Sequence, residues 1–196
     1  FTAKKLTVNS GVLTISPGTS ITILNELINN SNATAVIIES GANLIQINGI
    51  SNTGAITVKR DSAPQVRLDH TLWSSPVTGQ NLFNFSTNTL TNRFYIYDTA
   101  ANKYVTTGLS SNTNFTPGKG YAIRAPNDWS SVLPATLKYN GVFTGVPNNG
   151  VISNALATDG LGYNLVGNPY PSPIDAVSFL ANNPALGGTL YFYAHT

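Results

Sequence analysis

The chain has 196 residues, enough for one large β domain or two small ones, and only 9% of them are charged, where about 25% is ordinary. A net charge of +2 without a run of like charges argues against nucleic acid as a partner. No apolar run reaches the roughly 18 residues of a membrane span, so we expect no membrane insertion.

Polarity comes mainly from 24 Asn, 23 Thr and 17 Ser, which suit turns and pleated faces and are typical of an extracellular β protein. The absence of Cys excludes disulfides, thiol nucleophiles and thiolate zinc sites. The chain begins at Phe1 and contains no Met, so we expect a mature or excised piece of a longer, secreted or cell-surface polypeptide.

The first sixty residues are short β-prone runs separated by Gly, Asn and Ser. Residues 12–21 align with residues 35–44 at an offset of 23, and residues 55–58 begin a third copy. A period of about 20–25 residues favours a solenoid, because each coil buries its inward face against the next. We predict a short β-helix or solenoid-like segment over residues 1–62, with an ordinary run of antiparallel strands as the alternative. The predicted strands are 6–8, 12–15, 20–24, 35–38, 43–47 and 55–58.

From Ala63 the aromatic content rises and apolar and polar residues alternate between turns marked by Pro and Gly. This pattern predicts an antiparallel, jelly-roll-like β-sandwich over residues 63–196. One short helix is expected from Pro173, at its first position, to about residue 180, with Ser172 as its N-cap and Asp175 closing a capping box. The predicted fold class is therefore all-β. The strands expected in the second segment are 82–85, 93–98, 120–124, 136–139 and 189–193.

Five motifs follow one another in the second segment: Leu72–Val77, Phe115–Pro126, Gly145–Gly150, Tyr163–Asp175 and Gly188–Tyr193. Together they resemble a module of large surface or adhesin-like proteins that bacteria export through the type IX secretion system. The resemblance covers about residues 63–196 and implies export and surface display, with no catalytic residue to carry over. It also implies further strands after residue 193. We therefore expect an incomplete sheet edge that pairs with neighbouring domains or copies.

Catalytic chemistry finds little support in the sequence. The two histidines, His70 and His195, accompany no nucleophile elbow, and Asp69 would point away from His70 on an extended strand. The eight carboxylates stand in no recognisable glycosidase context, and phosphate-loop, dinucleotide and zinc-protease motifs are missing. We predict no enzyme activity and no cofactor. Calcium stays open, because its oxygen ligands can come from distant loops.

Carbohydrate is the best ligand hypothesis, because exposed aromatic rings stack on sugars while Asn and Asp bind hydroxyls. Asn127, Asp128 and Trp129 follow one another in a loop-like stretch, and Trp129 is the aromatic residue most expected to be exposed. The alternative is that its ring closes the end of the sandwich. Trp73, which lies inside a motif, is expected in the core.

Two short motifs indicate modification. Secreted proteins of the resembled group carry O-linked glycans where Asp precedes Ser or Thr and a small apolar residue, as at Asp61–Ala63 and Asp98–Ala100. Ser62 and Thr99 are therefore candidate glycosylation sites, and Ser62 lies where an exposed domain junction is expected.

These observations predict a non-catalytic structural or adhesive segment of a secreted or cell-surface bacterial protein that contributes to an extracellular fibre. The alternative is a carbohydrate-binding accessory domain of a secreted polysaccharide-degrading enzyme, with glycans as its partners.

Overall fold

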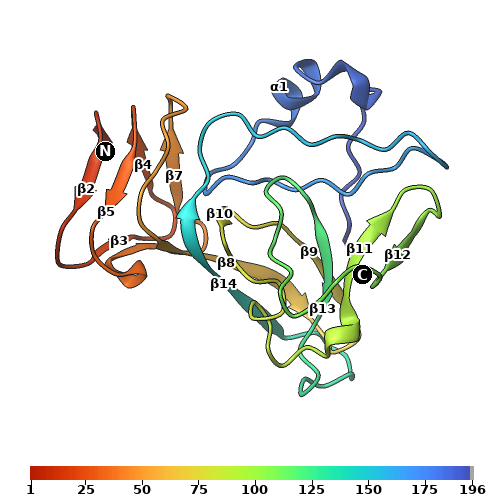
Figure 1. Cartoon of the computed structure of the whole chain (residues 1–196). Coiled ribbons are helices and arrows are strands. Elements are labelled where there is room, and N and C mark those ends of the chain that lie inside the picture. Colours follow the sequence, from red (N-terminus) through yellow and green to blue (C-terminus); the bar gives the residue numbers. More distant parts are fainter. Residues whose placement is uncertain (195–196) are drawn as a thin grey trace.

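The computed structural model describes residues 1–194, and its regular secondary structure consists of strands apart from one short helix and three 3-10 turns, so the predicted all-β class is confirmed. The first 65 residues form three tiers of short strands (Figure 1). The first tier holds β1 (Thr2–Ala3), β2 (Leu6–Val8) and β3 (Leu13–Ile15). The second holds β4 (Ser20–Ile23), β5 (Leu27–Asn29) and β6 (Val36–Ile38), with a 3-10 turn η1 (Ala33–Ala35). The third holds β7 (Asn43–Gln46) and β8 (Ile56–Gln65).

Strands of successive tiers pair in parallel and in a regular register. Leu13 of β3 lies opposite Val36 of β6, and Ile21 of β4 lies opposite Leu44 of β7, which are the partners that the offset of 23 aligns. Elsewhere the offset is 20 or 21, as between β1 and β4 or between β2 and β5. The alternative of an antiparallel run is wrong for these strands, because every pair between the tiers is parallel.

A tight turn closes the third tier. Thr53 bridges Ile28 of β5, and Gly54 follows with a φ of +83°. A Cβ at Gly54 would lie 2.0 Å from the Asn29 carbonyl oxygen. Both the left-handed backbone and the close approach to β5 therefore require glycine at this position.

The remaining strands pair antiparallel and complete two larger sheets. One has the order β10-β14-β8-β6-β3, and the other has the order β12-β11-β13-β9. Their bounds are β9 (His70–Trp73), β10 (Val77–Thr78), β11 (Phe94–Asp98), β12 (Lys103–Val105), β13 (Tyr121–Arg124) and β14 (Leu137–Pro147). Two more 3-10 turns are η2 (Thr91–Arg93) and η3 (Pro184–Leu186).

Strand β8 joins the two parts of the molecule. Its first residues pair in parallel with β6, while most of its length pairs antiparallel with β14. The strand runs without interruption across residue 62, where the sequence places a domain boundary. The division into residues 1–62 and 63–196 stays a prediction.

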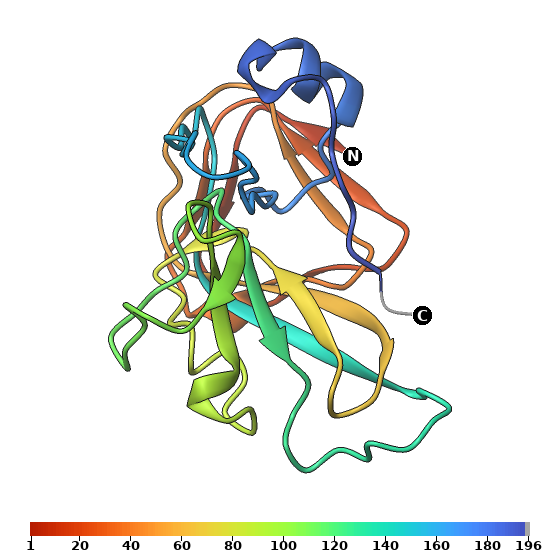
Figure 2. The same cartoon turned by 90° about the vertical axis from the view of Figure 1, so that its right-hand side faces the viewer.

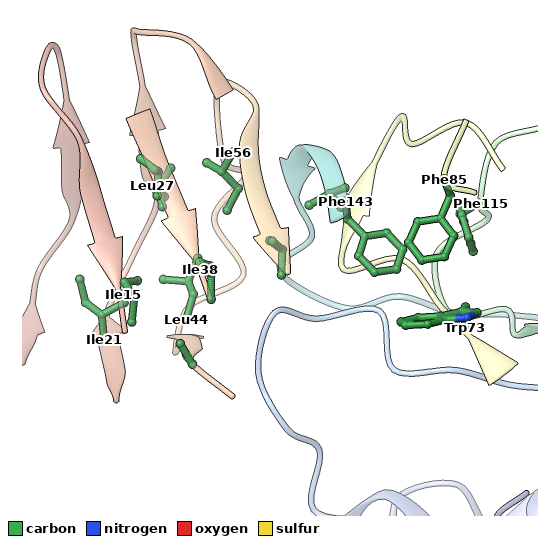
Figure 3. Close-up of a cluster of buried hydrophobic side chains, with 14 of the residues drawn as sticks. Ile15, Ile21, Leu27, Ile38, Leu44, Ile56, Trp73, Phe85, Phe115 and Phe143 are labelled. Atoms are coloured by element: carbon green, nitrogen blue, oxygen red, sulfur yellow. The ribbon is translucent and has the colours of Figure 1, made fainter. Parts of the chain in front are cut away.

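The hydrophobic core changes character along the molecule (Figure 3). Aliphatic side chains such as Leu27 and Ile38 fill the tiers, whereas aromatic rings gather where β14 meets β9. Trp73 lies 5.0 Å from Phe85 between ring centroids and is 7% exposed, which confirms the predicted core position.

Two predicted strands are wrong. Residues 82–85 form a turn in which Asn81 Oδ1 accepts a hydrogen bond from Asn84 N, although Leu82 and Phe85 are buried as strand residues would be. Residues 189–194 form no strand, and Tyr191 and Phe192 are 74% and 84% exposed. The alternation of residues 82–85 therefore reflected side-chain burial, and that of residues 189–193 reflected β propensity. Neither pattern showed whether the backbone pairs with another strand.

The expected short helix is present as α1 (Ala176–Ala181), which lies on the outside of the molecule in both views (Figures 1 and 2). Its N-cap is Asp175, whose Oδ1 accepts a hydrogen bond from Ser178 N at 2.6 Å. The prediction of Ser172 as the cap is wrong, because the helix begins three residues later than a cap at Ser172 requires. Hydrogen bonds from the Ser178 side chain and from its backbone N–H lower the pKa of the Asp175 carboxyl. Among residues 1–194 no helix is long and apolar enough to cross a membrane.

Candidate functional site

The predicted ligand residues Asn127, Asp128 and Trp129 lie together on a turn after β13. Backbone and side-chain bonds attach this turn to Asn88: Asn127 N donates to Asn88 O at 2.8 Å, and Asn88 Nδ2 donates to Asp128 Oδ2 at 3.2 Å. Asn127 and Asp128 are exposed. The turn is therefore a fixed part of the surface that presents one amide and one carboxylate.

Trp129 is less exposed than the sequence predicts. Its side chain is half-buried, and its ring lies 6.3 Å from the ring of Tyr139 on β14. By comparison, Tyr191 and Phe192 near the end of the chain are 74% and 84% exposed. A role for Trp129 in ligand contact stays a prediction.

Both candidate glycosylation residues are buried. Ser62 is 7% exposed, and its hydroxyl donates to Ala63 O and accepts from Tyr139 N across the sheet. Thr99 is 8% exposed and donates to Tyr163 O at 2.7 Å. The expected open hydroxyl at Ser62 is wrong, because β8 continues through this position and pairs with β14. Glycosylation at either residue stays a prediction that requires the hydroxyl to be modified before these contacts form.

A hollow of about 330 Å³ lies between the third tier and two later loops. Its polar lining is occupied by bonds within the protein: Asn149 Nδ2 donates to Asn48 O and Ile50 O, and Tyr170 Oη donates to Gly150 O. Nearby, Asn52 exchanges hydrogen bonds with Gln46 and donates to Pro147 O. These amides form a seam that holds the loops against the tiers.

A second hollow of about 340 Å³ lies beside the turn that carries Trp129. Its lining is mostly apolar and includes Val132 and Leu133, which are 72% and 73% exposed. Among residues 1–194, no group of three or more His, Asp or Glu side chains is arranged to hold a metal ion. His195 lies outside the described residues.

A group of basic side chains that no sequence pattern predicts lies on the outer face of the sheet with the order β12-β11-β13-β9. Arg124 of β13 lies opposite His70 of β9 in the strand register, and the His70 ring contacts Tyr95 of β11 at 5.5 Å. Burial and the charges of Arg93 and Arg67 lower the pKa of Arg124, whereas Tyr95 opposes this shift. We call Arg67, Arg93, Arg124 and His70 the arginine cluster.

Arg124 is buried although it carries a charge. It is 8% exposed, and its Nη2 donates to Asn127 Oδ1 at 2.8 Å. Its Nε and the Nε of Arg67 are buried without a hydrogen-bond partner among the described residues. Among residues 1–194, salt bridges join Lys5 to Glu26 and Lys59 to Glu39, and none of these four residues belongs to the cluster.

His70 and Asp69 are two further titratable groups at the arginine cluster. Burial, Arg124 and Arg93 lower the pKa of His70, whereas Asp69 raises it. Asp69 Oδ2 also accepts a hydrogen bond from Val66 N at 2.8 Å. The His70 ring itself lies against Tyr95. The three arginines come from the loop after β8, from η2 and from β13, so no run of charge in the sequence marks them.

In a comparison with known protein families, the whole chain, residues 1–196, matches the family described as "Domain of unknown function (DUF8693)". A search of the curated proteins and a search of the solved structures each gave no match.

Proposed function

We propose that this chain, which belongs to the DUF8693 family, is a non-catalytic structural or adhesive segment of a secreted or cell-surface bacterial protein. In this proposal residues 1–62 are the coils of a short β-solenoid stalk and the following residues form a jelly-roll-like sandwich. Export through the type IX pathway and membership of an extracellular fibre belong to the same proposal and rest on the resemblance of the motifs. Strand pairing with neighbouring domains or copies would join the segments.

One observation carries the structural role: the two ends of the tiered stack are built differently. At one end β14 pairs with β8, and the side-chain amides of Asn52 and Asn149 hold later loops against the third tier. At the other end β1, β2 and β3 are each the last strand of their sheet. The outer backbone edges of these three strands therefore lie at the same end of the stack, and no strand among the described residues pairs with them.

The core is also open at this first tier. Leu6 and Leu13 are only half-buried, whereas their register partners Leu27 and Val36 are 0% exposed. Phe1 at the same end is 81% exposed. Terminal repeats of a solenoid need a cap or a further repeat, because the last coil cannot bury its own face. The open face therefore supports a segment whose stack continues into more polypeptide of the same kind.

Adding one tier tests this proposal. Phe1 aligns with Ile21 and Leu44, so a copy of residues 20–43 placed directly before Phe1 continues the stack in register. We expect the midpoint of thermal unfolding to rise by about 5 °C, because the copied inward side chains would cover Leu6 and Leu13. Amide hydrogen exchange in β1, β2 and β3 should slow at the same time.

The matched control carries the same added residues with the copied Ile21, Ile23 and Leu27 changed to Ser. It lengthens the chain equally but supplies no apolar face, so its unfolding midpoint should equal that of the unextended protein. Equal midpoints for the extended protein and this control would contradict the proposal that the first tier is built to continue.

A further inference from the structure

We propose that the arginine cluster binds a single oxyanion group, a sulfate or a carboxylate, carried by an acidic polysaccharide. The inference goes beyond the structural role proposed above and is independent of it, because no residue of the cluster belongs to the open tier. It concerns the outer face of the sheet formed by β9, β13 and β11.

The first argument is the state of Arg124. Arg124 as a residue is only 8% exposed, and the lost hydration of a buried guanidinium N–H is normally offset by a carboxylate or another hydrogen-bond acceptor. Here Asn127 accepts one bond from Nη2, while Nε has no partner among the described residues. Arg67 has the same unpartnered Nε. Two unsatisfied donors of like charge in one place favour an anionic acceptor.

The second argument is the repulsion within the cluster. The charges of Arg93 and Arg67 both act unfavourably on Arg124. Two carboxylates are near the cluster in sequence: Asp69 accepts from Val66 N and its charge acts on His70, and Asp128 accepts from Asn88. An oxyanion among three arginines would relieve this repulsion and could accept forked hydrogen bonds, which the planar guanidinium is suited to donate.

The surroundings indicate a polysaccharide as the source of the oxyanion. The exposed amide of Asn127 contacts Arg124 directly, and Asp128 beside it can accept bonds from sugar hydroxyls. The chain's net charge is only +2 and its basic residues form no stripe, so the surface does not suit the continuous backbone of a nucleic acid. A site with one concentrated charge fits an isolated sulfate or uronate group on an otherwise neutral chain.

The test measures binding of the whole chain to dextran sulfate, to polygalacturonate, to uncharged dextran and to inorganic sulfate by isothermal titration calorimetry at low ionic strength. We expect binding to at least one acidic polymer, little binding to dextran, and weaker binding to sulfate than to the polymer. Arg124→Gln should lower the polymer affinity at least tenfold. Arg93→Gln, at a half-buried position, should lower it about threefold.

Lys4→Gln is the matched control, since it removes one positive charge from the first tier, far from the cluster in sequence. Its effect on polymer affinity should stay under twofold. Thermal unfolding of Arg124→Gln reports whether that variant folds, and Arg93→Gln keeps the test valid if it does not. Absence of binding to both acidic polymers would overturn the proposal, as would equal losses in Lys4→Gln and Arg93→Gln. Inorganic sulfate binding as tightly as the polymer would overturn the assignment to a polysaccharide.

Discussion

Replacing Phe143 by alanine should lower the free energy of unfolding by about 3–5 kcal/mol, the largest loss we expect from one side chain. Phe143 of β14 is 0% exposed. Its ring stacks on Phe85 at 4.5 Å and lies 5.6 Å from Phe115 and 6.1 Å from Trp73. The substitution would therefore leave a cavity between three rings, in a core without disulfides to hold the strands together.

Urea unfolding followed by tryptophan fluorescence measures this loss, with Trp73 beside the cavity as the reporter. Val142→Ala is the matched control, because Val142 is the neighbouring residue of the same strand and is 44% exposed. It should cost about 0.5 kcal/mol. A loss below about 1 kcal/mol for Phe143→Ala, with an unchanged dependence on urea, would mean that β14 does not bring this ring into the core.

Replacing Asn29 by alanine should cost about 2–4 kcal/mol, although the residue is small and polar. Asn29 is 3% exposed inside the tiers. Its Nδ2 donates to Asn32 O and to Ala55 O, and its Oδ1 accepts from Ser31 N. The bond to Ala55 connects the second tier to the third. Alanine would leave buried backbone groups without partners, which costs more than the hydrogen bonds themselves contribute.

Asn30→Ala is the control for this effect. Asn30 is the next residue, is exposed and donates one side-chain bond, to Asn9 Oδ1. Its replacement should change the unfolding free energy by no more than about 0.5 kcal/mol, measured by the same urea titration. Equal effects of the two substitutions would show that the buried hydrogen bonds of Asn29 contribute no more to the free energy of unfolding than the exposed hydrogen bond of Asn30.

The sequence by itself determined the features that depend on local chemistry and short-range repetition. The offset of 23 residues predicted the partners Leu13 with Val36 and Ile21 with Leu44, because the same inward positions recur in each tier. The all-β class followed from the short β-prone runs. The presence of α1 followed from a Ser, Pro and Asp start signal, although this signal placed the start of the helix three residues too early. Trp73 was predicted to be buried from its place within one of the motifs that carry the family resemblance.

Only the tertiary structure decided how far each strand extends and what it pairs with. β8 continues to Gln65 because β14 offers a partner along its whole length, and Ser62 is buried for the same reason. Residues 82–85 alternate as a strand would, yet the Asn81 side chain closes them into a turn while Phe85 still packs into the core. Local patterns report which side chains are buried but not which backbone groups are paired.

The candidate sites depend on tertiary structure most of all. Arg67, Arg93 and Arg124 lie 26 and 31 residues apart in a loop, in η2 and in β13, and only the strand order β11-β13-β9 brings them together. The amides of the seam between the tiers and the later loops likewise come from positions about a hundred residues apart, such as Asn48 and Asn149. Electrostatic and hydrogen-bond interactions act through space, whereas the signals that can be read along a chain are limited to neighbouring residues and regular repeats.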